Sequence, residues 1–242
     1  MILGIDTSTA LTSVALLDGD ATVSFHWHLN ARRHAEVIGP MLEQAMSRVR
    51  AADITRVVCG VGPGPYTGLR VGVAAARAMA FAWGVPAVGV CSLDAIAEAG
   101  AGQFGDMVVA TDARRSEVYW AHYDSEGHRT DGPRVGRAED VTAPGAWLGQ
   151  GAVLHHRLEA TLRDLPQESA LISPTAEWVA RIGGRGELSA AMAAGHTDTV
   201  DDLSAHGGDG SPTSEALRGR SLLAPQPLYL RRPDAMEVAV TR

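Results

Sequence analysis

A loop rich in glycine and proline is the part of this sequence best suited to close contact with a ligand. It runs Gly60-Val61-Gly62-Pro63-Gly64-Pro65-Tyr66-Thr67-Gly68-Leu69-Arg70-Val71-Gly72, between an apolar run and an alanine-rich helical pattern. Glycine tolerates positive φ and a neighbouring backbone, and free N–H groups at a helix start favour an anionic or polar partner. The loop fits neither a P-loop nor a dinucleotide-binding pattern, because Thr67 stands where glycine is needed and no Lys-Ser/Thr follows.

A second candidate for ligand binding is Asp6-Thr7-Ser8-Thr9, which ends the first apolar run. An acidic residue followed by hydroxyl and backbone N–H groups is similar to the turn with which actin-like ATPases hold phosphates and magnesium. A glycine usually stands at the position of Ser8 in that turn. The same residues also suit a tight turn that Asp6 and Thr7 stabilise by hydrogen bonds. The sequence leaves both interpretations open.

The types of charged residue exclude several kinds of chemistry. The sequence has no lysine, and all 21 of its basic residues are arginine. Lysine nucleophiles, lysine bases and P-loop lysines are therefore excluded. His26 and His28 share a strand face, but no third ligand stands near them, and we expect no metal site. Asp112 and Arg114, at a turn, either face the cleft between two lobes or form an ion pair within their own hairpin.

Length and composition are typical of a cytosolic globular protein. The 242 residues are 45% hydrophobic, enough for one large domain or two lobes. The net charge of −7 argues against a protein that binds nucleic acid by itself. Cys59 and Cys91 stand in apolar runs, as reduced core residues do. Residues 1–10 have no basic segment and contain Asp6, so we expect no signal peptide and a cytoplasmic location without membrane contact.

The hydrophobic patterns predict an α/β fold in two lobes with mixed sheets. The first lobe, residues 1–105, should open with three strands and alternate afterwards between helices and strands. The second lobe, residues 106–242, should open with a strand pair and include a flexible segment at about 183–221, which is rich in Gly, Ala, Ser and Asp. Predicted strands cover 1–5, 12–17, 21–29, 56–60, 87–90, 107–111 and 117–123. Predicted helices cover 33–50, 67–83, 93–99, 155–162 and 175–182.

Two of the predicted helices carry features of a docking surface. The helix over 33–50 offers Val37, Ile38, Met41, Leu42 and Ala45, more apolar surface than one inner face requires. The helix over 67–83 has a stripe of small residues that lets another backbone come close: Gly68, Gly72, Ala75, Ala76 and Ala80. We expect these helices to bind a partner, although the stripe suits packing on the chain's own sheet equally well.

Taken together, five motifs in this order resemble the TsaB family. They are Ile2-Leu3-Gly4-Ile5-Asp6-Thr7-Ser8-Thr9, Arg33-His34, Gly62-Pro63-Gly64-Pro65-Tyr66-Thr67-Gly68-Leu69-Arg70-Val71-Gly72, Asp112-Ala113-Arg114-Arg115-Ser116-Glu117-Val118-Tyr119 and Tyr229-Leu230-Arg231. The resemblance implies an actin-like, ribonuclease H-like fold and a role in placing threonylcarbamoyl on the adenosine beside the anticodon of tRNA. It also implies a heterodimer with the catalytic paralogue TsaD, a TsaE-type ATPase as third component, a homodimer when alone, and tRNA contact only through the complex.

The resemblance further implies a subunit without catalytic residues. TsaD carries a metal-binding His-x-x-x-His, and in this sequence Ser92 and Ile96 stand at the corresponding positions. An aliphatic side chain cannot ligate a metal, so no ion would activate a carbonyl here. Asp6, Thr7, Ser8, Thr9, Asp112 and Arg114 would line a vestigial nucleotide cleft. We expect no tightly bound cofactor and at most weak binding of ADP or ATP; the alternative is a small-metabolite kinase of the same superfold.

Overall fold

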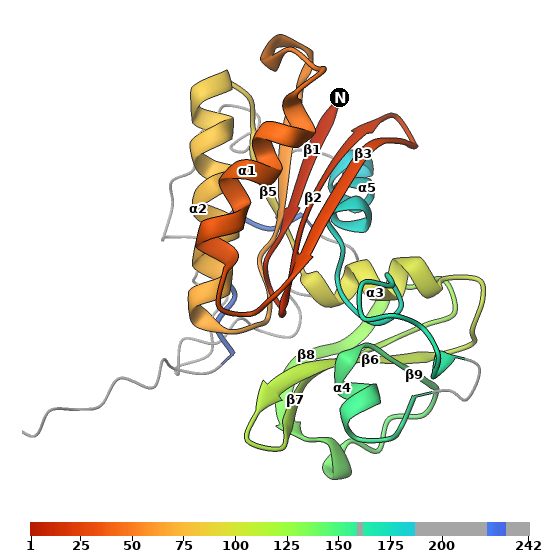
Figure 1. Ribbon diagram of the computed structural model, residues 1–242. Coiled ribbons are helices and arrows are strands. Elements are labelled where there is room, and N and C mark those ends of the chain that lie inside the picture. The colour runs from red at the N-terminus through yellow and green to blue at the C-terminus, as the bar shows by residue number, and fades with distance from the viewer. Residues whose placement is uncertain (159–161, 187–221, 231–242) are drawn as a thin grey trace, which may run out of the picture.

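Two mixed β-sheets organise the chain in the computed structural model, which describes residues 1–158, 162–186 and 222–230 (Figure 1). The first sheet has the strand order β3-β2-β1-β4-β5 and the second has the order β8-β7-β6-β9. Helices cover both faces of the first sheet, while α3 and α4 pack against the second. The α/β class with mixed sheets is therefore confirmed.

The first sheet joins an antiparallel meander to two parallel strands. Its members are β1 (Ile2–Asp6), β2 (Leu11–Asp18), β3 (Ala21–Leu29), β4 (Arg56–Gly60) and β5 (Ala87–Val90). β1 pairs antiparallel with β2 and parallel with β4. Gly19, at a φ of 57°, turns the chain between β2 and β3, as the sequence Asp18-Gly19-Asp20 predicts. The carboxyl ends of β1, β4 and β5 meet at one edge of the sheet, where the Asp6 turn lies.

Three helices enclose the first sheet. α1 (His34–Met46) and α2 (Tyr66–Trp83) cover one face, and α5 (Ala176–Arg185) covers the other. The first face holds the larger core, built from apolar side chains of the sheet and of both helices. On the opposite face α5 crosses β1 so closely that a Cβ at Gly4 would collide with the carbonyl oxygen of Ala176. Glycine at position 4 is what permits this approach.

The second sheet is built from β6 (Met107–Arg114), β7 (Glu117–Tyr123), β8 (Arg129–Arg137) and β9 (Ala146–Leu148). The sequence patterns predicted β6 and β7 but missed β8 and β9. β8 includes Gly132, Pro133 and Gly136, and β9 has three residues, so neither shows an alternating pattern long enough to read. α3 (Ser92–Gly100) and α4 (Gln150–Leu154) pack on this sheet.

The helix predicted over 155–162 is wrong in position. The structure has α4 at Gln150–Leu154 instead, and His156 takes a positive φ of 55°, which no α-helix continues through. Residues 159–161 lie outside the described part of the chain. Leu158 and Leu162 of the predicted helix are buried in the core, but α4 ends before them at Leu154.

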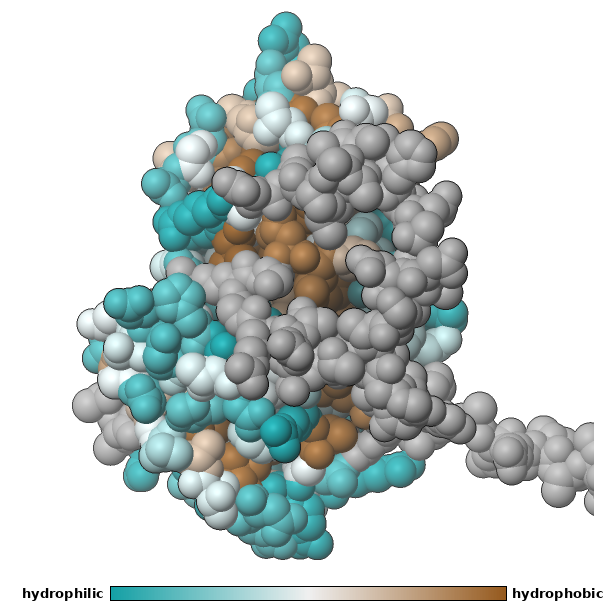
Figure 2. Space-filling view, turned by 180° about the vertical axis from the view of Figure 1, so that it is seen from behind, coloured by the Kyte–Doolittle hydropathy of each residue, from teal (hydrophilic) through white to brown (hydrophobic). Residues whose placement is uncertain are grey.

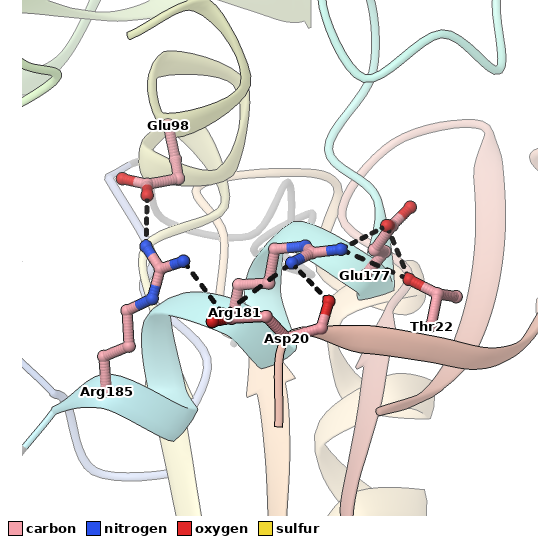
Figure 3. A network of polar contacts seen from close by, with 6 residues as sticks. All are labelled: Asp20, Thr22, Glu98, Glu177, Arg181 and Arg185. Atoms are coloured by element: carbon pink, nitrogen blue, oxygen red, sulfur yellow. Dashed lines mark hydrogen bonds and ion pairs between the residues drawn. The ribbon is translucent and has the colours of Figure 1, made fainter. Parts of the chain in front are cut away.

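Helix α5 follows the strands of the second sheet in the chain but packs on the first sheet, where a polar network holds it (Figure 3). Arg181 donates to Glu177 at 2.9 Å and to the carbonyl oxygen of Asp20 at 2.8 Å. Arg185 donates to Glu98 of α3 at 3.0 Å and to the Asp20 carboxylate at 3.1 Å. These contacts fix α5 between the β2–β3 hairpin and α3. The predicted lobe boundary near residue 105 stays a prediction, and α5 belongs by its contacts to the first sheet.

The last described residues, 222–230, close the edge of the first sheet. Leu223 pairs with Gly89 of β5, and the N–H of Leu228 donates to the carbonyl oxygen of Val61 at 2.7 Å. Tyr229 stacks on Tyr66 with 4.8 Å between ring centroids. The predicted flexible segment at 183–221 lies outside the described residues from 187 onward, and residues 183–185 are the last turn of α5.

The visible surface is mainly polar at its two ends. Figure 2 shows, on the face opposite that of Figure 1, apolar residues gathered near the middle between areas of hydrophilic residues. Within the described part of the chain, none of the helices has the length and apolar character needed to cross a membrane.

Candidate functional site

The turn formed by Asp6, Thr7, Ser8 and Thr9 is buried at the carboxyl end of β1. Asp6, Thr7 and Ser8 are at most 1% exposed, and Thr9 is 7% exposed. One carboxylate oxygen of Asp6 accepts hydrogen bonds from the backbone N–H and the hydroxyl of Ser8, at 2.8 and 2.7 Å. The other accepts the hydroxyl of Ser92 at 2.8 Å. Both oxygens are thus bound by groups of the chain itself, as in the tight-turn interpretation.

The glycine-proline loop covers this turn directly. A Cβ at Gly60 would collide with the Asp6 carboxylate, and a Cβ at Gly64 would collide with the carbonyl oxygen of Ser8. The N–H of Gly62 donates to the Ser92 hydroxyl at 3.1 Å. The glycines therefore serve close approach, as the sequence suggested, but the backbone that approaches belongs to the same chain.

Thr7 connects the turn to helix α2. Its hydroxyl donates to the carbonyl oxygen of Gly68 at 2.7 Å and accepts from the N–H of Gly72 at 3.1 Å. A Cβ at Gly68 would come within 2.6 Å of the Thr7 carbonyl oxygen, and a Cβ at Gly72 would collide with the Thr7 hydroxyl. The first turns of α2 therefore lie directly on the Asp6 turn.

Burial raises the pKa of the Asp6 carboxyl group. Desolvation raises the pKa of its carboxyl from 3.8 to about 6, although the hydrogen bonds from Ser8 and Ser92 favour the charged form. Nearby, burial lowers the pKa of His34, whose Nδ1 lies 2.6 Å from the Thr12 hydroxyl. Burial also raises the pKa of the Cys59 thiol to about 12, so this cysteine is a core residue and not a nucleophile.

Replacing Asp6 by asparagine should change how stability depends on pH. The folded chain binds more protons than the unfolded chain between pH 4 and 6, because the folded pKa lies above the ordinary one. The contribution of Asp6 to the free energy of unfolding therefore falls as pH rises through this window, by roughly 2–3 kcal/mol, and is level above it. The lowered pKa of His34 contributes the opposite slope near pH 6, but equally in both proteins. In urea denaturation at pH 4 to 7.5, the free energy of unfolding of the native protein relative to that of Asp6→Asn should therefore fall by this amount.

The matched control for this pH series is Asp53→Asn. The hydrogen bond from exposed Arg50 lowers the pKa of Asp53, so its titration lies below the window. This variant should keep the native slope between pH 4 and 6. Equal slopes in the native protein and in Asp6→Asn would contradict the assignment.

Asp112 and Arg114, the two candidate site residues on β6, pair with each other. Asp112 and Arg114 form an ion pair of 3.1 Å, and the N–H of Arg114 donates to the Asp112 carboxylate at 2.8 Å. The Arg114 side chain is 66% exposed, whereas the Asp6 turn is closed over by its own loop. Residues 6–9 of the predicted vestigial cleft are buried, and the ion pair of Asp112 with Arg114 agrees with the alternative interpretation of these two residues as a pair within their own hairpin. A nucleotide role for the six residues stays a prediction.

The structure corrects the expected exposure of the docking residues. Ile38, Met41, Leu42 and Ala45 are 4–8% exposed and belong to the core between α1, α2 and the first sheet. Gly68, Gly72 and Ala76 are buried against the chain itself, while Val37 and Ala75 are partly buried. The predicted stripe thus packs inside, because glycine at positions 68 and 72 leaves room for Thr7 of the Asp6 turn.

A second small-residue stripe, which the sequence reasoning missed, faces outward on α2. Ala74, Ala78 and Ala82 are exposed at a spacing of four, and Phe81 beside them is 91% exposed. The residues of a helix at this spacing share one face. The sequence contained this signal, since the same helix carries alanine on both sides.

Ser92 was the other residue whose role the sequence did not reveal. It begins α3 just after β5, with its hydroxyl bridging Asp6 and Gly62, while Ile96 is fully buried in the core beside the second sheet. The signal that could have found Ser92 is its place after a parallel strand, because the ends of β1, β4 and β5 share one edge.

The chain is similar to a known protein family, to curated proteins and to solved structures. A family model described as "TsaD: tRNA N6-adenosine threonylcarbamoyltransferase" matches residues 26–170, more than half of the chain. The uncharacterized protein Rv3421c of Mycobacterium tuberculosis is 45% identical over 163 residues, covering 66% of this chain and 75% of its own length. The structure of YeaZ from Pseudomonas aeruginosa is similar with a TM-score of 0.64 and 28% identity, covering 76% of this chain and 90% of YeaZ.

Relatives with a descriptive name match a shorter region. The tRNA threonylcarbamoyladenosine biosynthesis protein TsaB of Escherichia coli is 38% identical over 129 residues, or 52% of this chain. TsaB of Bacillus subtilis is 32% identical over 124 residues. The matched regions span about half the length of these two proteins, 55% and 54%. The resemblance to TsaB and the actin-like fold predicted from the motifs are confirmed by these similarities.

Proposed function

Because the chain belongs to the TsaD family and is similar to TsaB proteins, we propose that it acts in the biosynthesis of threonylcarbamoyladenosine in tRNA. Within that pathway we assign it the role of a non-catalytic scaffold subunit. It forms a heterodimer with a catalytic TsaD homologue in the cytoplasm, is joined by a TsaE-type ATPase, and contacts tRNA as part of this complex. Without its partner it forms a homodimer.

The non-catalytic role proposed for this subunit rests on one observation, that the Asp6 turn is covered by the chain's own groups. Both oxygens of the Asp6 carboxylate are occupied by Ser8 and Ser92, and the loop backbone at Gly60 and Gly64 lies against the turn. A phosphate and its metal ion would need the space and the oxygens that these groups occupy. Ile96 adds support, because an apolar side chain buried in the core has no donor to offer a metal. ADP and ATP should therefore bind weakly.

We place the docking surface for the TsaD homologue on the outer face of α2. Ala74, Ala78 and Ala82 are exposed in a row, so a helix of the partner can approach closely, and Phe81 offers a large apolar side chain at the end of the row. α1 lies beside α2, and its exposed Gly39 has open space around it. Two helices from each subunit would together bury about 1,200–2,000 Å².

Ala78→Arg should weaken association with the TsaD homologue by at least about tenfold, because it places a long charged side chain in the middle of the row. The fold should persist, since Ala78 is exposed. Analytical ultracentrifugation with the TsaD homologue of the same organism measures the association, and Ala51→Arg, at an exposed position outside the two helices, is the control. Unchanged association of Ala78→Arg would contradict the docking surface.

A reconstituted reaction tests the pathway role itself. The chain, the TsaD homologue and the TsaE-type ATPase together should transfer threonylcarbamoyl to unmodified tRNA, and omission of the chain should abolish the transfer. Titration of the isolated chain with magnesium-ATP tests the kinase alternative. We expect weak binding, which would argue against a kinase. Micromolar binding of ATP, or transfer without the chain, would contradict the scaffold role.

A further inference from the structure

A pocket of about 230 Å³ opens in the second lobe and shares no residue with the Asp6 turn. Three separate segments line it. Ser116 comes from the turn between β6 and β7, and His155 and Arg157 follow α4. Arg137 ends β8, and Ala138 and Glu139 lie in the short 3-10 helix η2 (Ala138–Asp140) that follows it. The pocket thus depends on tertiary structure and belongs to none of the sites described above.

The lining of the pocket is rich in hydrogen-bond donors and positive charge. Two guanidinium groups, an imidazole and a hydroxyl face a single carboxylate, that of Glu139, which lies 2.6 Å from Arg137. One positive charge therefore remains even with His155 neutral. In a chain whose net charge is −7, this local excess of cations favours an anionic ligand.

Arg157 is held in place before any ligand arrives. Its guanidinium lies 4.5 Å from the ring centroid of Trp147, and its Nη1 donates to the carbonyl oxygen of Val141 at 2.9 Å. That bond uses one of the five N–H donors of the group. A guanidinium fixed in this way loses little freedom when it binds an oxyanion with two parallel hydrogen bonds.

The turn that presents Ser116 departs from local sequence preference. Arg114 pairs with Glu117 after an irregularity in the register, and three consecutive residues, Arg114, Arg115 and Ser116, have positive φ, at 64°, 55° and 62°. Turns with positive φ favour Asn and Gly, because other side chains are strained there. Arg-Arg-Ser at these positions costs conformational energy. Such departures concentrate at functional sites, where they place a side chain for a purpose other than stability.

We propose that this pocket binds a phosphate group, through Arg137, Arg157 and the hydroxyl of Ser116. Three donor groups from three separate segments suit phosphate, whose several oxygens can each accept a hydrogen bond, better than a planar carboxylate with two oxygens. Under the proposed function, on which this part of the inference rests, the phosphate is a phosphodiester of the bound tRNA. A free phosphate is the other source of the same chemistry.

Titration of the isolated chain with inorganic phosphate, followed by NMR signals of the arginine side chains, tests the pocket independently of any partner. Arg137→Ala and Arg157→Met should each weaken phosphate binding by roughly tenfold. Arg134→Ala is the matched control, because Arg134 lies on the same strand in an exposed ion pair with Asp131 and does not line the pocket. Native affinity in both pocket variants would overturn the proposal.

Ser116→Gly separates a binding role from a structural one. Glycine relieves the strain of the positive φ, so the melting temperature should rise, while loss of the hydroxyl should weaken phosphate binding about threefold or more. A purely structural residue would change only the melting temperature. An unchanged affinity for phosphate would remove Ser116 from the site.

Binding of unmodified tRNA to the complex with the TsaD homologue identifies the source of the phosphate. Arg137→Ala should weaken tRNA binding and reduce the slope of log affinity against log salt by about one, with no change in Arg134→Ala. If tRNA binding is unchanged while phosphate binding is lost, the pocket takes a free phosphate and the tRNA source is wrong. If the native complex neither binds nor modifies tRNA, the proposed function fails, whereas the phosphate titration still decides the pocket.

Discussion

Gly72→Leu should destabilise the fold by about 3 kcal/mol. A Cβ at this position already collides with the Thr7 hydroxyl, and the Cβ and Cγ2 of Thr7 lie only 3.3 Å from it. That hydroxyl also accepts the N–H of Gly72 and donates to the carbonyl oxygen of Gly68. A leucine would have to push α2 away from the Asp6 turn and break these bonds. Urea denaturation at pH 7 measures the loss.

Ala74→Leu is the control on the same helix with the same new side chain. Ala74 is exposed, and leucine forms helices nearly as well as alanine, so the free energy of unfolding should change by less than about 0.5 kcal/mol. This variant should instead weaken association with the TsaD homologue if the outer face of α2 is the docking surface. Native stability of Gly72→Leu would contradict the packing of α2 on Thr7.

Arg129→Met should have the largest effect, a loss of about 3–5 kcal/mol of stability. Arg129 of β8 donates to both oxygens of Asp94 of α3, at 2.9 and 3.0 Å, and both side chains are 1% exposed. The hydroxyl of Tyr123 donates to the same carboxylate at 2.8 Å. Removing the guanidinium leaves a buried carboxylate without its counter-charge, in the contact that joins α3 to the second sheet. Guanidinium chloride denaturation measures the difference.

Two further variants show whether the lost charge is the cause. Arg134→Met removes an exposed partner of Asp131 on the same strand and should cost less than about 1 kcal/mol. The double variant Asp94→Leu/Arg129→Met should be more stable than Arg129→Met alone, because it leaves no buried charge. If the double variant is no better than Arg129→Met, lost packing and not the unpaired carboxylate explains the effect.

The sequence by itself determined the elements with strong local signals. Asp18-Gly19-Asp20 specified the first hairpin, because Gly19 takes the positive φ that the turn requires. The alanine-rich run determined α2 to within one residue, and Gly84, at a φ of 66°, ends it. Five other motifs, from Ile2–Thr9 to Tyr229–Arg231, identified the family and the actin-like fold. These features depend on backbone preferences and side-chain periods that neighbouring residues set.

Only the tertiary structure decided which surfaces are inside and which residues meet. Both faces of α2 carry small residues, so its period could not show that Gly72 packs on Thr7 while Ala74 faces outward. Asp6 and Ser92 are 86 positions apart, and their hydrogen bond exists because β1, β4 and β5 end at one edge of the sheet. The phosphate pocket likewise joins three segments that no local pattern connects. Contacts of this range depend on how the sheets pair and pack, which a single sequence does not contain as a periodic signal.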